Sequence, residues 1–140
     1  MNDLKGKVAI VTGAGSGIGR AIAELYAARG ASVLVSDVDE VGGKETLRMI
    51  EEAGGSAVFR AADVSKPHEN EALAESAMAH FGRLDIACNN AGIGGAIKPT
   101  ADYGIDDWQH VIDVNLSGVF YGMKYQIPRM LKSGGGSIVN

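Results

Sequence analysis

The sequence predicts an α/β fold, a doubly wound parallel sheet with strand order 3-2-1-4-5. Two observations support this prediction: short apolar runs alternate with segments of helical periodicity, and a glycine-rich turn follows the first apolar run. Strands separated by helices imply right-handed crossovers and a parallel sheet with helices on both faces. The apolar runs show no clean alternation with polar residues, which is typical of strands buried on both faces.

Each element has its own signal in the sequence. Apolar runs predict strands at residues 7–11, 32–36, 56–61, 84–89 and 137–140. Helical spacing predicts helices at residues 17–29, 41–53, 65–81 and 106–130. Gly30 is expected at the C′ position of the first helix, after an apolar side formed by Ile18, Ile22 and Leu25. The third helix is expected to be capped by Ser65.

The last predicted helix is unusually long. Its expected apolar face consists of Trp108, Val111, Ile112, Leu116, Val119 and Met123. Pro128 is expected to end or bend this helix, because proline lacks the backbone N–H and clashes with the preceding turn. Asn115 falls on the same face, where an unpaired amide would cost on the order of 1–3 kcal/mol. It should therefore have partners or a functional role.

The turn after the first strand holds four glycines within residues 13–19. Glycine allows positive φ and a close approach of backbone to a bound group. The helix that follows offers unpaired N–H groups and the positive end of its dipole, which favour a phosphate. Gly13, Gly17 and Gly19 give the spacing G-x-x-x-G-x-G, a variant of the dinucleotide-binding turn of Rossmann-like folds. The alternative is an ordinary tight connection between strand and helix.

Asp37 strengthens the dinucleotide interpretation. It ends the second strand, close to the offset of roughly 20 residues at which a ribose-binding acid is found. A carboxylate there would bind both adenosine ribose hydroxyls and repel a 2′-phosphate. Neither Ser16 nor Val38 is basic, so the sequence favours NAD over NADP. The alternative is that Asp37 serves only as a turn or cap residue.

Composition sets further bounds. With 46% hydrophobic residues, residues 1–140 are expected to form a single domain. Thirteen basic and 17 acidic residues give a net charge of −4 and no basic run, so no nucleic-acid partner is expected. No stretch approaches the roughly 20 apolar residues of a membrane span, and residues 1–7 lack a secretory signal. The single Cys88 excludes an internal disulfide, no grouping suggests a metal site, and a cytoplasmic protein is the default expectation.

Four motifs together resemble the signature of the short-chain dehydrogenase/reductase family, over essentially the whole chain. They are Thr12-Gly13-x-x-x-Gly17-x-Gly19, Asp63-Val64, Asn89-Asn90-Ala91-Gly92 and Val114-Asn115-Leu116-x-Gly118. The resemblance implies an oxidoreductase that transfers hydride between NAD and a secondary alcohol or ketone. If the chain stops after strand five, that strand becomes an exposed edge and one face of the long helix stays bare, so a homo-oligomer is expected, formed through the long helix as in the family or non-specifically.

The resemblance also implies roles for individual residues. Asp63 would contact adenine, Thr12 and Asn90 would brace the sheet and the turn, and Asn115 would belong to the catalytic relay that holds a water. The candidate cofactor-binding residues are Gly13, Gly15, Ser16, Gly17, Ile18, Gly19, Asp37, Asp63, Val64, Asn89, Ala91 and Gly92. Structural alternatives remain: Asp63 as a helix cap, Asn89 and Asn90 as turn residues, and Asn115 as a core amide.

The sequence departs from the family pattern in one respect. The family's catalytic serine follows the fifth strand and its Tyr-x-x-x-Lys pair lies on the next helix, whereas these residues stop at Asn140. Tyr125 is followed at that spacing by Arg129, on a different helix, and is not assigned to catalysis. The chain is therefore expected to be truncated after strand five and inactive alone. The alternatives are a non-catalytic dinucleotide-binding module or a fragment that a second chain complements.

Overall fold

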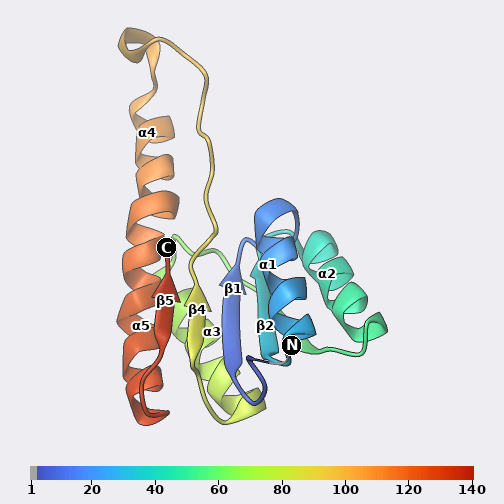
Figure 1. Cartoon of the computed structure of the whole chain (residues 1–140). Coiled ribbons are helices and arrows are strands. Elements are labelled where there is room, and N and C mark those ends of the chain that lie inside the picture. The colour runs from blue at the N-terminus through green and yellow to red at the C-terminus, as the bar shows by residue number, and fades with distance from the viewer. Residues whose placement is uncertain (1–2) are drawn as a thin grey trace.

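A computed structural model describes residues 3–140 (Figure 1); residues 1–2 of the N-terminal segment lie outside the described part. The five strands form one sheet in the order β3-β2-β1-β4-β5, as predicted. All four strand pairs are parallel, and Val11 lies opposite both Val35 and Cys88. The strands are β1 (Val8–Thr12), β2 (Ser32–Asp37), β3 (Ser56–Ala61), β4 (Ile86–Cys88) and β5 (Ser137–Val139).

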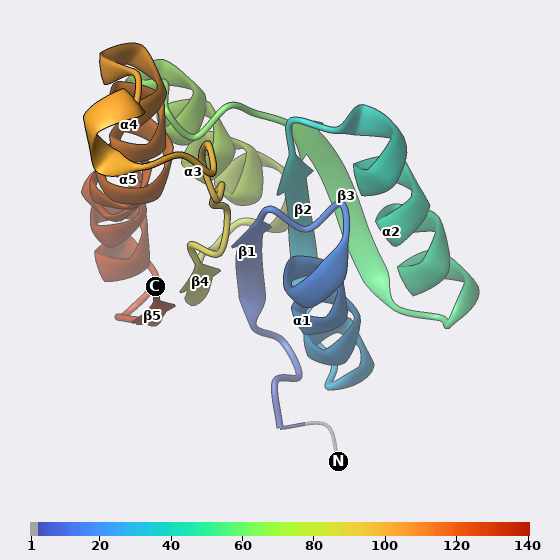
Figure 2. The same ribbon diagram turned by 90° about the horizontal axis from the view of Figure 1, so that it is seen from above.

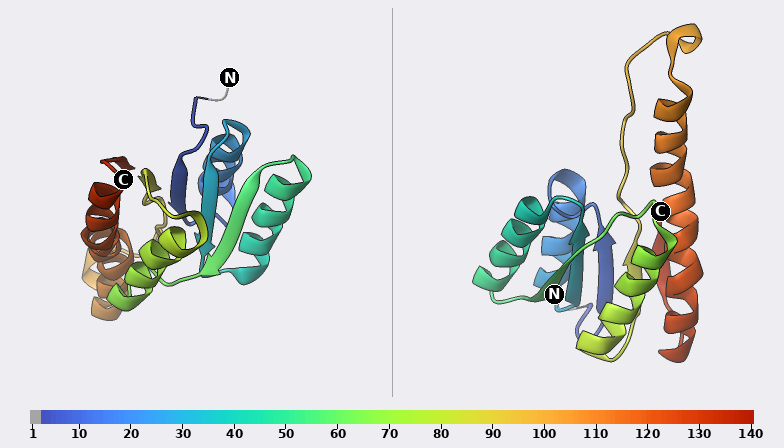
Figure 3. Two further views of the ribbon diagram at one scale, coloured as in Figure 1. Left: turned by 90° about the horizontal axis from the view of Figure 1, so that it is seen from below. Right: turned by 180° about the vertical axis from the view of Figure 1, so that it is seen from behind.

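Helices cover both faces of the sheet. Figures 2 and 3 show α1 and α2 on one face and α3 and α5 on the other. The helices are α1 (Gly17–Ala28), α2 (Glu40–Glu52), α3 (Pro67–Phe81), α4 (Ile105–Ile112) and α5 (Gly118–Lys132). A 3-10 turn, η1 (Thr100–Asp102), precedes α4, and a π-helical segment, η2 (Asp113–Ser117), joins α4 to α5. Among residues 3–140, no helix is both long enough and apolar enough to cross a membrane.

The central strand β1 is buried at every position, which explains its unbroken apolar run. Its alternate side chains contribute to two apolar clusters, one on each face of the sheet. Ile10 packs beneath α3 and α5 with Leu73 and Met130, whereas Val11 packs beneath α1 and α2 with Ala23 and Ile50. The sheet is therefore packed on both faces by helices, and this packing fixes the position of its carboxyl edge.

The buried side of α1 differs from the expected one. Ile18 and Leu25 are exposed, and Gly19, Ala23 and Ala27 face the sheet instead. Small side chains allow the helix axis to approach the strands closely just after the glycine turn. The expected apolar side was therefore wrong at Ile18 and Leu25, whereas Ile22 packs against the core and Gly30 takes the positive φ expected at C′.

The long predicted helix is present, but its buried face is also shifted. Trp108 and Leu116 are 60% and 64% exposed, so the expected apolar face is wrong at these positions. The buried residues instead recur every fourth position: Val114, Gly118, Gly122, Gln126 and Met130. Pro128 does not end the helix, which continues to Lys132 because Met130 is buried against the sheet. Figure 1 shows α4 and the loop before it extending beyond the strands.

The start of α3 also differs from the prediction. The N-cap residue is Lys66 and the helix begins at Pro67, so the assignment of Ser65 as the cap is wrong. The Ser65 hydroxyl instead donates to Asp63 Oδ1 at 2.7 Å, and its backbone N–H donates to the same atom at 2.9 Å. Asp63 thus organises the turn that precedes the helix.

Candidate functional site

The glycine turn between β1 and α1 lies at the carboxyl end of the sheet, and its close contacts explain its glycines. Gly13 has φ 64°, and a Cβ there would lie 2.8 Å from Ala91 Cα. A Cβ on Gly19 would overlap the carbonyl oxygen of Gly13. The turn therefore leaves no room for side chains at these two positions, and backbone forms the surface at the start of α1.

Two side chains tie this turn to the strand beside it. Asn90 Nδ2 donates to the carbonyl oxygens of Thr12 and Gly13, at 3.0 and 3.3 Å. The backbone N–H of Ala91 donates to Thr12 Oγ1 at 3.1 Å. These bonds confirm that Thr12 and Asn90 brace the sheet and the turn.

Asp37 ends β2 directly beside the glycine turn. Its Oδ2 accepts a hydrogen bond of 2.8 Å from the backbone N–H of Gly15, and its Oδ1 accepts one of 2.9 Å from Asp39. The half-buried carboxylate is thus a turn residue, as the alternative interpretation proposed. Each carboxylate oxygen has more than one lone pair, so this role leaves Asp37 able to bind a ligand as well.

A cleft of about 320 Å³ opens beside this carboxylate. Six of the predicted site residues line it: Gly13, Ser16, Asp37, Val64, Ala91 and Gly92. Three further lining residues, Val38, Asn90 and Val114, entered the sequence analysis in other roles, whereas Ser36, Ala62, Ile93 and His110 were not singled out there. The structure therefore brings together the ends of β1, β2 and β4, the turn after β3, and the helix α4–η2.

Ser36 is an unexpected member of the cleft lining. Its residue is 1% exposed, and its buried hydroxyl has no hydrogen-bond partner among residues 3–140. A buried hydroxyl without a partner is costly, so such an atom is often found where a ligand or water binds. Serine within an apolar strand carries no sequence signal of this kind.

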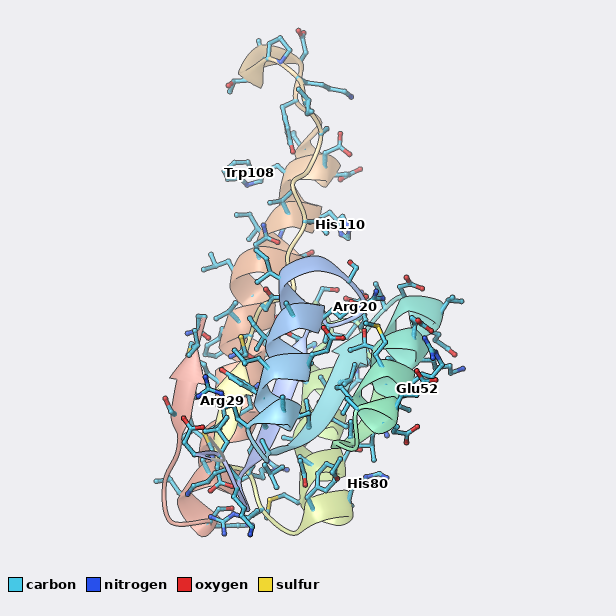
Figure 4. All side chains as sticks on the ribbon, turned by 45° about the vertical axis from the view of Figure 1, so that its right-hand side comes forward. Arg20, Arg29, Glu52, His80, Trp108 and His110 are labelled. Carbon is cyan, nitrogen blue, oxygen red and sulfur yellow. The ribbon has the colours of Figure 1, made fainter. Side chains whose placement is uncertain are left out.

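His110 was likewise missed. It projects from α4 on the side opposite Trp108 (Figure 4). His110 lies four residues before Val114, so the two side chains share one face of the helix, and both line the cleft. That spacing was available in the sequence, but nothing there indicated which side of the helix the cleft occupies.

Asp63 lies beside the cleft rather than in its lining. Partial burial raises the pKa of its carboxyl, but the hydrogen bonds from Ser65 and the charge of Lys66 together outweigh this. The pKa therefore lies below its ordinary value, and Asp63 is a carboxylate at neutral pH. Its Oδ1 fixes the turn before α3, which supports the local structural role that the sequence left open.

Asn89 is not among the residues that line the cleft. It exchanges two hydrogen bonds with Gln126 of α5: Asn89 Nδ2 donates at 3.1 Å, and Gln126 Nε2 donates to Asn89 Oδ1 at 2.7 Å. Both side chains are buried. The amide pair anchors α5 to the end of β4.

Asn115 is exposed, in contrast to the buried position expected from the helical wheel. Its Oδ1 accepts from the backbone N–H of Ile93 at 2.9 Å, and its Nδ2 donates to the Ile93 carbonyl at 2.9 Å. The residue lies in the π-helical segment η2, which turns it away from the sheet and toward the loop after β4. Single π turns within α-helices frequently occur at functional sites.

Tyr125 and Arg129 take no part in this cleft. Arg129 Nη2 lies 3.5 Å from Glu75 Oε1 and 3.9 Å from Glu71 Oε1, both on α3. Its Nη1 donates to the Tyr125 carbonyl at 3.3 Å. Arg129 therefore connects α5 to α3.

The parallel sheet, its 3-2-1-4-5 order and the glycine turn define a doubly wound α/β protein with a cleft at the carboxyl edge. The family model for short chain dehydrogenase matches residues 7–140. The chain belongs to the short-chain dehydrogenase/reductase family, whose members use a nicotinamide dinucleotide.

Three relatives illustrate the match. Cyclohexanol dehydrogenase of Acinetobacter sp. (strain SE19) is 45% identical over 139 residues, which cover 99% of this chain and 55% of that protein. 3beta-hydroxysteroid dehydrogenase 1 of Eggerthella lenta is 48% identical over 131 residues, which cover 93% of this chain and 50% of that protein. The crystal structure of levodione reductase superposes with a TM-score of 0.93 at 35% identity, covering 97% of this chain and 54% of that one. The chain thus spans about half the length of the relatives it matches.

Proposed function

We propose that this chain supplies the NAD-binding part of a dehydrogenase that transfers hydride between NAD and a secondary alcohol or ketone. The observation that carries the proposal is the cleft in which the glycine turn and the Asp37 carboxylate face the same space. A dinucleotide needs both features, because its diphosphate requires close backbone N–H groups and its ribose requires a hydrogen-bond acceptor.

The residues present fit such a cofactor. Gly13 and Gly19 have no space for a Cβ, so the backbone of the turn can approach a diphosphate at the N-terminus of α1. The side chain of Ser16, the N-cap residue, makes no capping bond to the helix and lines the cleft. Gly15, Gly17 and Ile18 complete the proposed diphosphate-binding turn. When bound, the dinucleotide supplies the hydride acceptor or donor of the reaction.

The preference for NAD follows from charge. Asp37 would accept hydrogen bonds from the ribose hydroxyls, whereas a 2′-phosphate would place negative charge against its carboxylate. Within the cleft lining, Ser16 and Val38 supply no cation to offset that repulsion. We therefore propose that NADP binds more weakly than NAD.

The adenine end of the cofactor is proposed to lie between Val64 and Ala91, with Asp63 and Gly92 at its edge. Asn89 would act indirectly, by holding β4 and α5 together beside the cleft. Asn115 is proposed to contribute to the catalytic relay, and its amide already joins η2 to the loop at Ile93. These roles are carried over from the family to residues whose positions around the cleft allow them.

The names of two relatives agree with the proposed reaction. Cyclohexanol dehydrogenase is named for a secondary alcohol, and 3beta-hydroxysteroid dehydrogenase 1 for a hydroxyl group on a steroid. Residues 1–140 contain no Tyr-x-x-x-Lys pair to move the alcohol proton. We therefore propose that these residues alone bind NAD without catalysing turnover.

We also propose that the chain self-associates through the helix α4–α5. Large apolar side chains remain exposed along it, and such patches promote association. They are Ile105, Trp108, Leu116, Phe120, Ile127 and Leu131.

Calorimetric titration of the 140-residue protein with NAD tests the main proposal. Saturable binding is expected, and a Gly19→Val variant should lose it because the added side chain would collide with the Gly13 carbonyl. Circular dichroism of the variant controls for folding. Folded wild-type protein that shows no NAD affinity would contradict the proposal.

A further inference from the structure

Arg20 occupies an unusual position directly after the glycine turn. Its half-buried side chain lies between α1 and α2 (Figure 4). Nη2 donates to the Gly15 carbonyl at 2.5 Å and lies 3.3 Å from the Gly42 carbonyl, while Nε donates to Thr46 Oγ1 at 2.9 Å. One guanidinium thus binds the glycine turn and two successive turns of α2.

Thr46 completes this connection. It is fully buried, and its hydroxyl lies 2.7 Å from the Ala14 carbonyl, to which it donates. The backbones of the turn and α2 also approach closely, since a Cβ on Gly42 would lie 2.6 Å from the Gly15 carbonyl oxygen. Arg20 and Thr46 therefore fix the position of α2 against the turn.

Gly15 links this arrangement to the proposed ribose site. Its carbonyl accepts from Arg20, and its N–H donates to Asp37 Oδ2 at 2.8 Å. A Cβ on Gly15 would lie 2.8 Å from the same carboxylate oxygen, so the two residues are in close contact. Any shift of Gly15 would consequently move the hydrogen bond that orients Asp37.

The charge of Arg20 is used differently from that of its neighbour Arg48. Arg48 pairs with Glu45 and Glu52 on the exposed side of α2. Arg20 forms no ion pair with a carboxylate in the part of the chain that the structure describes, and its N–H groups are directed to backbone carbonyls and a hydroxyl. A cation placed in this way serves to position backbone.

We propose that Arg20 is a positioning residue that sets the preference for NAD over NADP by holding Gly15, and through it Asp37, in place. This inference rests on the proposed function. A carboxylate held by Gly15 cannot turn away from a 2′-phosphate. Its repulsion of that phosphate therefore acts at full strength and favours NAD over NADP. When Gly15 is released, Asp37 keeps only the hydrogen bond from Asp39 N–H and can turn about it, which weakens its bonds to ribose and relieves its repulsion of the phosphate.

The test compares Kd values for NAD and NADP, measured by calorimetry, in Arg20→Met and wild type. Loss of a charged hydrogen-bond network should raise the Kd for NAD about tenfold, and the NADP-to-NAD ratio of Kd values should fall by a similar factor. Arg48→Met is the matched control, because it removes an arginine that contacts only α2; the ratio should stay at the wild-type value.

A second comparison separates positioning from a general effect on folding. In an Asp37→Ala background, Arg20→Met should leave the ratio unchanged, because the residue through which it acts is absent. Arg20→Lys retains the charge without the planar fork and should give an intermediate ratio. If Arg20→Met is unfolded, Arg20→Lys and Thr46→Val provide the same test, each with a lowered ratio expected.

Equal weakening of NAD and NADP in the folded variants would overturn the inference and reduce Arg20 to a stabilising residue. A ratio that still falls in the Asp37→Ala background would also overturn it. Wild-type protein that binds neither dinucleotide would contradict the proposed function itself, which distinguishes that failure from this one.

Discussion

Asp37 shows how one side chain serves both the fold and the proposed site. Its two oxygens accept backbone hydrogen bonds from Gly15 and Asp39 and face the cleft. Replacing Asp37 by alanine should raise the Kd for NAD about 10- to 100-fold, because a charged hydrogen bond contributes about 1.5–3 kcal/mol. Calorimetry measures the change.

Asp39→Ala provides the control for that substitution. Asp39 caps α2 by accepting from Val41 N–H at 3.1 Å, and it is not part of the cleft lining. Loss of this cap should lower the free energy of unfolding by about 1 kcal/mol while leaving NAD affinity close to wild type. Equal effects of the two substitutions on affinity would argue against a direct role for Asp37.

A second prediction concerns Asp85, which directly precedes β4 at the amino end of the sheet, opposite the cleft. It accepts hydrogen bonds from Val8 N–H at 2.9 Å and from Arg83 Nε at 2.7 Å. Burial raises the pKa of Asp85, but the hydrogen bonds from Arg83 and Val8 and the charges of Arg83 and Lys7 together lower it below its ordinary value. Its ionised form therefore stabilises the fold above the unfolded-state pKa, and this contribution is lost as pH falls through the folded-state value.

Arg83→Met should move acid unfolding to higher pH, since the carboxylate then loses the side-chain hydrogen bonds that lower its pKa. The Asp85→Asn variant should be less stable than wild type at neutral pH, and its free energy of unfolding should fall less as the pH is lowered. Urea unfolding at several pH values between about 2 and 7 measures both effects, in the range where carboxylates titrate. Identical acid profiles for wild type and Asp85→Asn would contradict this account.

At the residue scale, motifs predicted the site better than periodicity did. Gly13, Gly19 and Asp37 lie at the turn and cleft because their chemistry is specific to such places. Asn115 was expected to be buried, yet the π-helical segment exposes it, and no spacing rule anticipates a π turn. Ser36 and Arg20 were missed because their roles depend on contacts with strands and helices distant in the sequence.

Among the elements, α5 is distinguished by glycine at two buried positions, where it closely approaches the residues that follow β3 and β4. A Cβ on Gly122 would lie 2.8 Å from Asn89 Oδ1, and one on Gly118 would lie 3.0 Å from Val64. Gly122→Ala should therefore separate the Asn89–Gln126 pair and lower the free energy of unfolding by about 1–3 kcal/mol, as overpacking usually does.

Gly94→Ala is the matched substitution, because a Cβ there would meet no atom within 4 Å. It should leave the stability almost unchanged or raise it slightly, through the reduced entropy of the unfolded chain. Thermal unfolding of both variants checks the difference. A Gly122→Ala protein as stable as wild type would show that α5 can shift without cost.

At the same scale, the sequence predicted that the long helix exists but not which side is buried. Its large apolar residues suggested one face, whereas the buried face includes Gly118, which lies close to Val64, and Gly122, which lies close to Asn89. Glycine is counted against helix formation and adds little to an apolar pattern. Only the requirement for close packing beside β4 explains why these residues face inward.

For the whole molecule, the proposed association through α4–α5 predicts more than one chain per particle. Leu116→Asp should shift the protein toward a monomer, because it places a charge within the exposed apolar patch. Val41→Asp is the control: Val41 is 81% exposed but lies on α2, away from this patch. Light scattering after size exclusion measures the mass, and a monomeric wild type at high concentration would contradict the proposal.

The architecture was the most predictable level. Alternating strands and helices, with a glycine turn after the first strand, leave few topologies once right-handed crossovers are required. The observed order β3-β2-β1-β4-β5 is the expected one. This order places the ends of β1, β2 and β4 at one edge, so the location of the cleft followed from topology even where individual side chains did not.

The central claim is that the cleft beside Asp37 binds NAD in preference to NADP. Calorimetric titration of one preparation with each dinucleotide tests it most directly. We predict that NAD binds at least about tenfold more tightly, a difference of about 1.4 kcal/mol. Equal affinities, or tighter binding of NADP, would contradict the account.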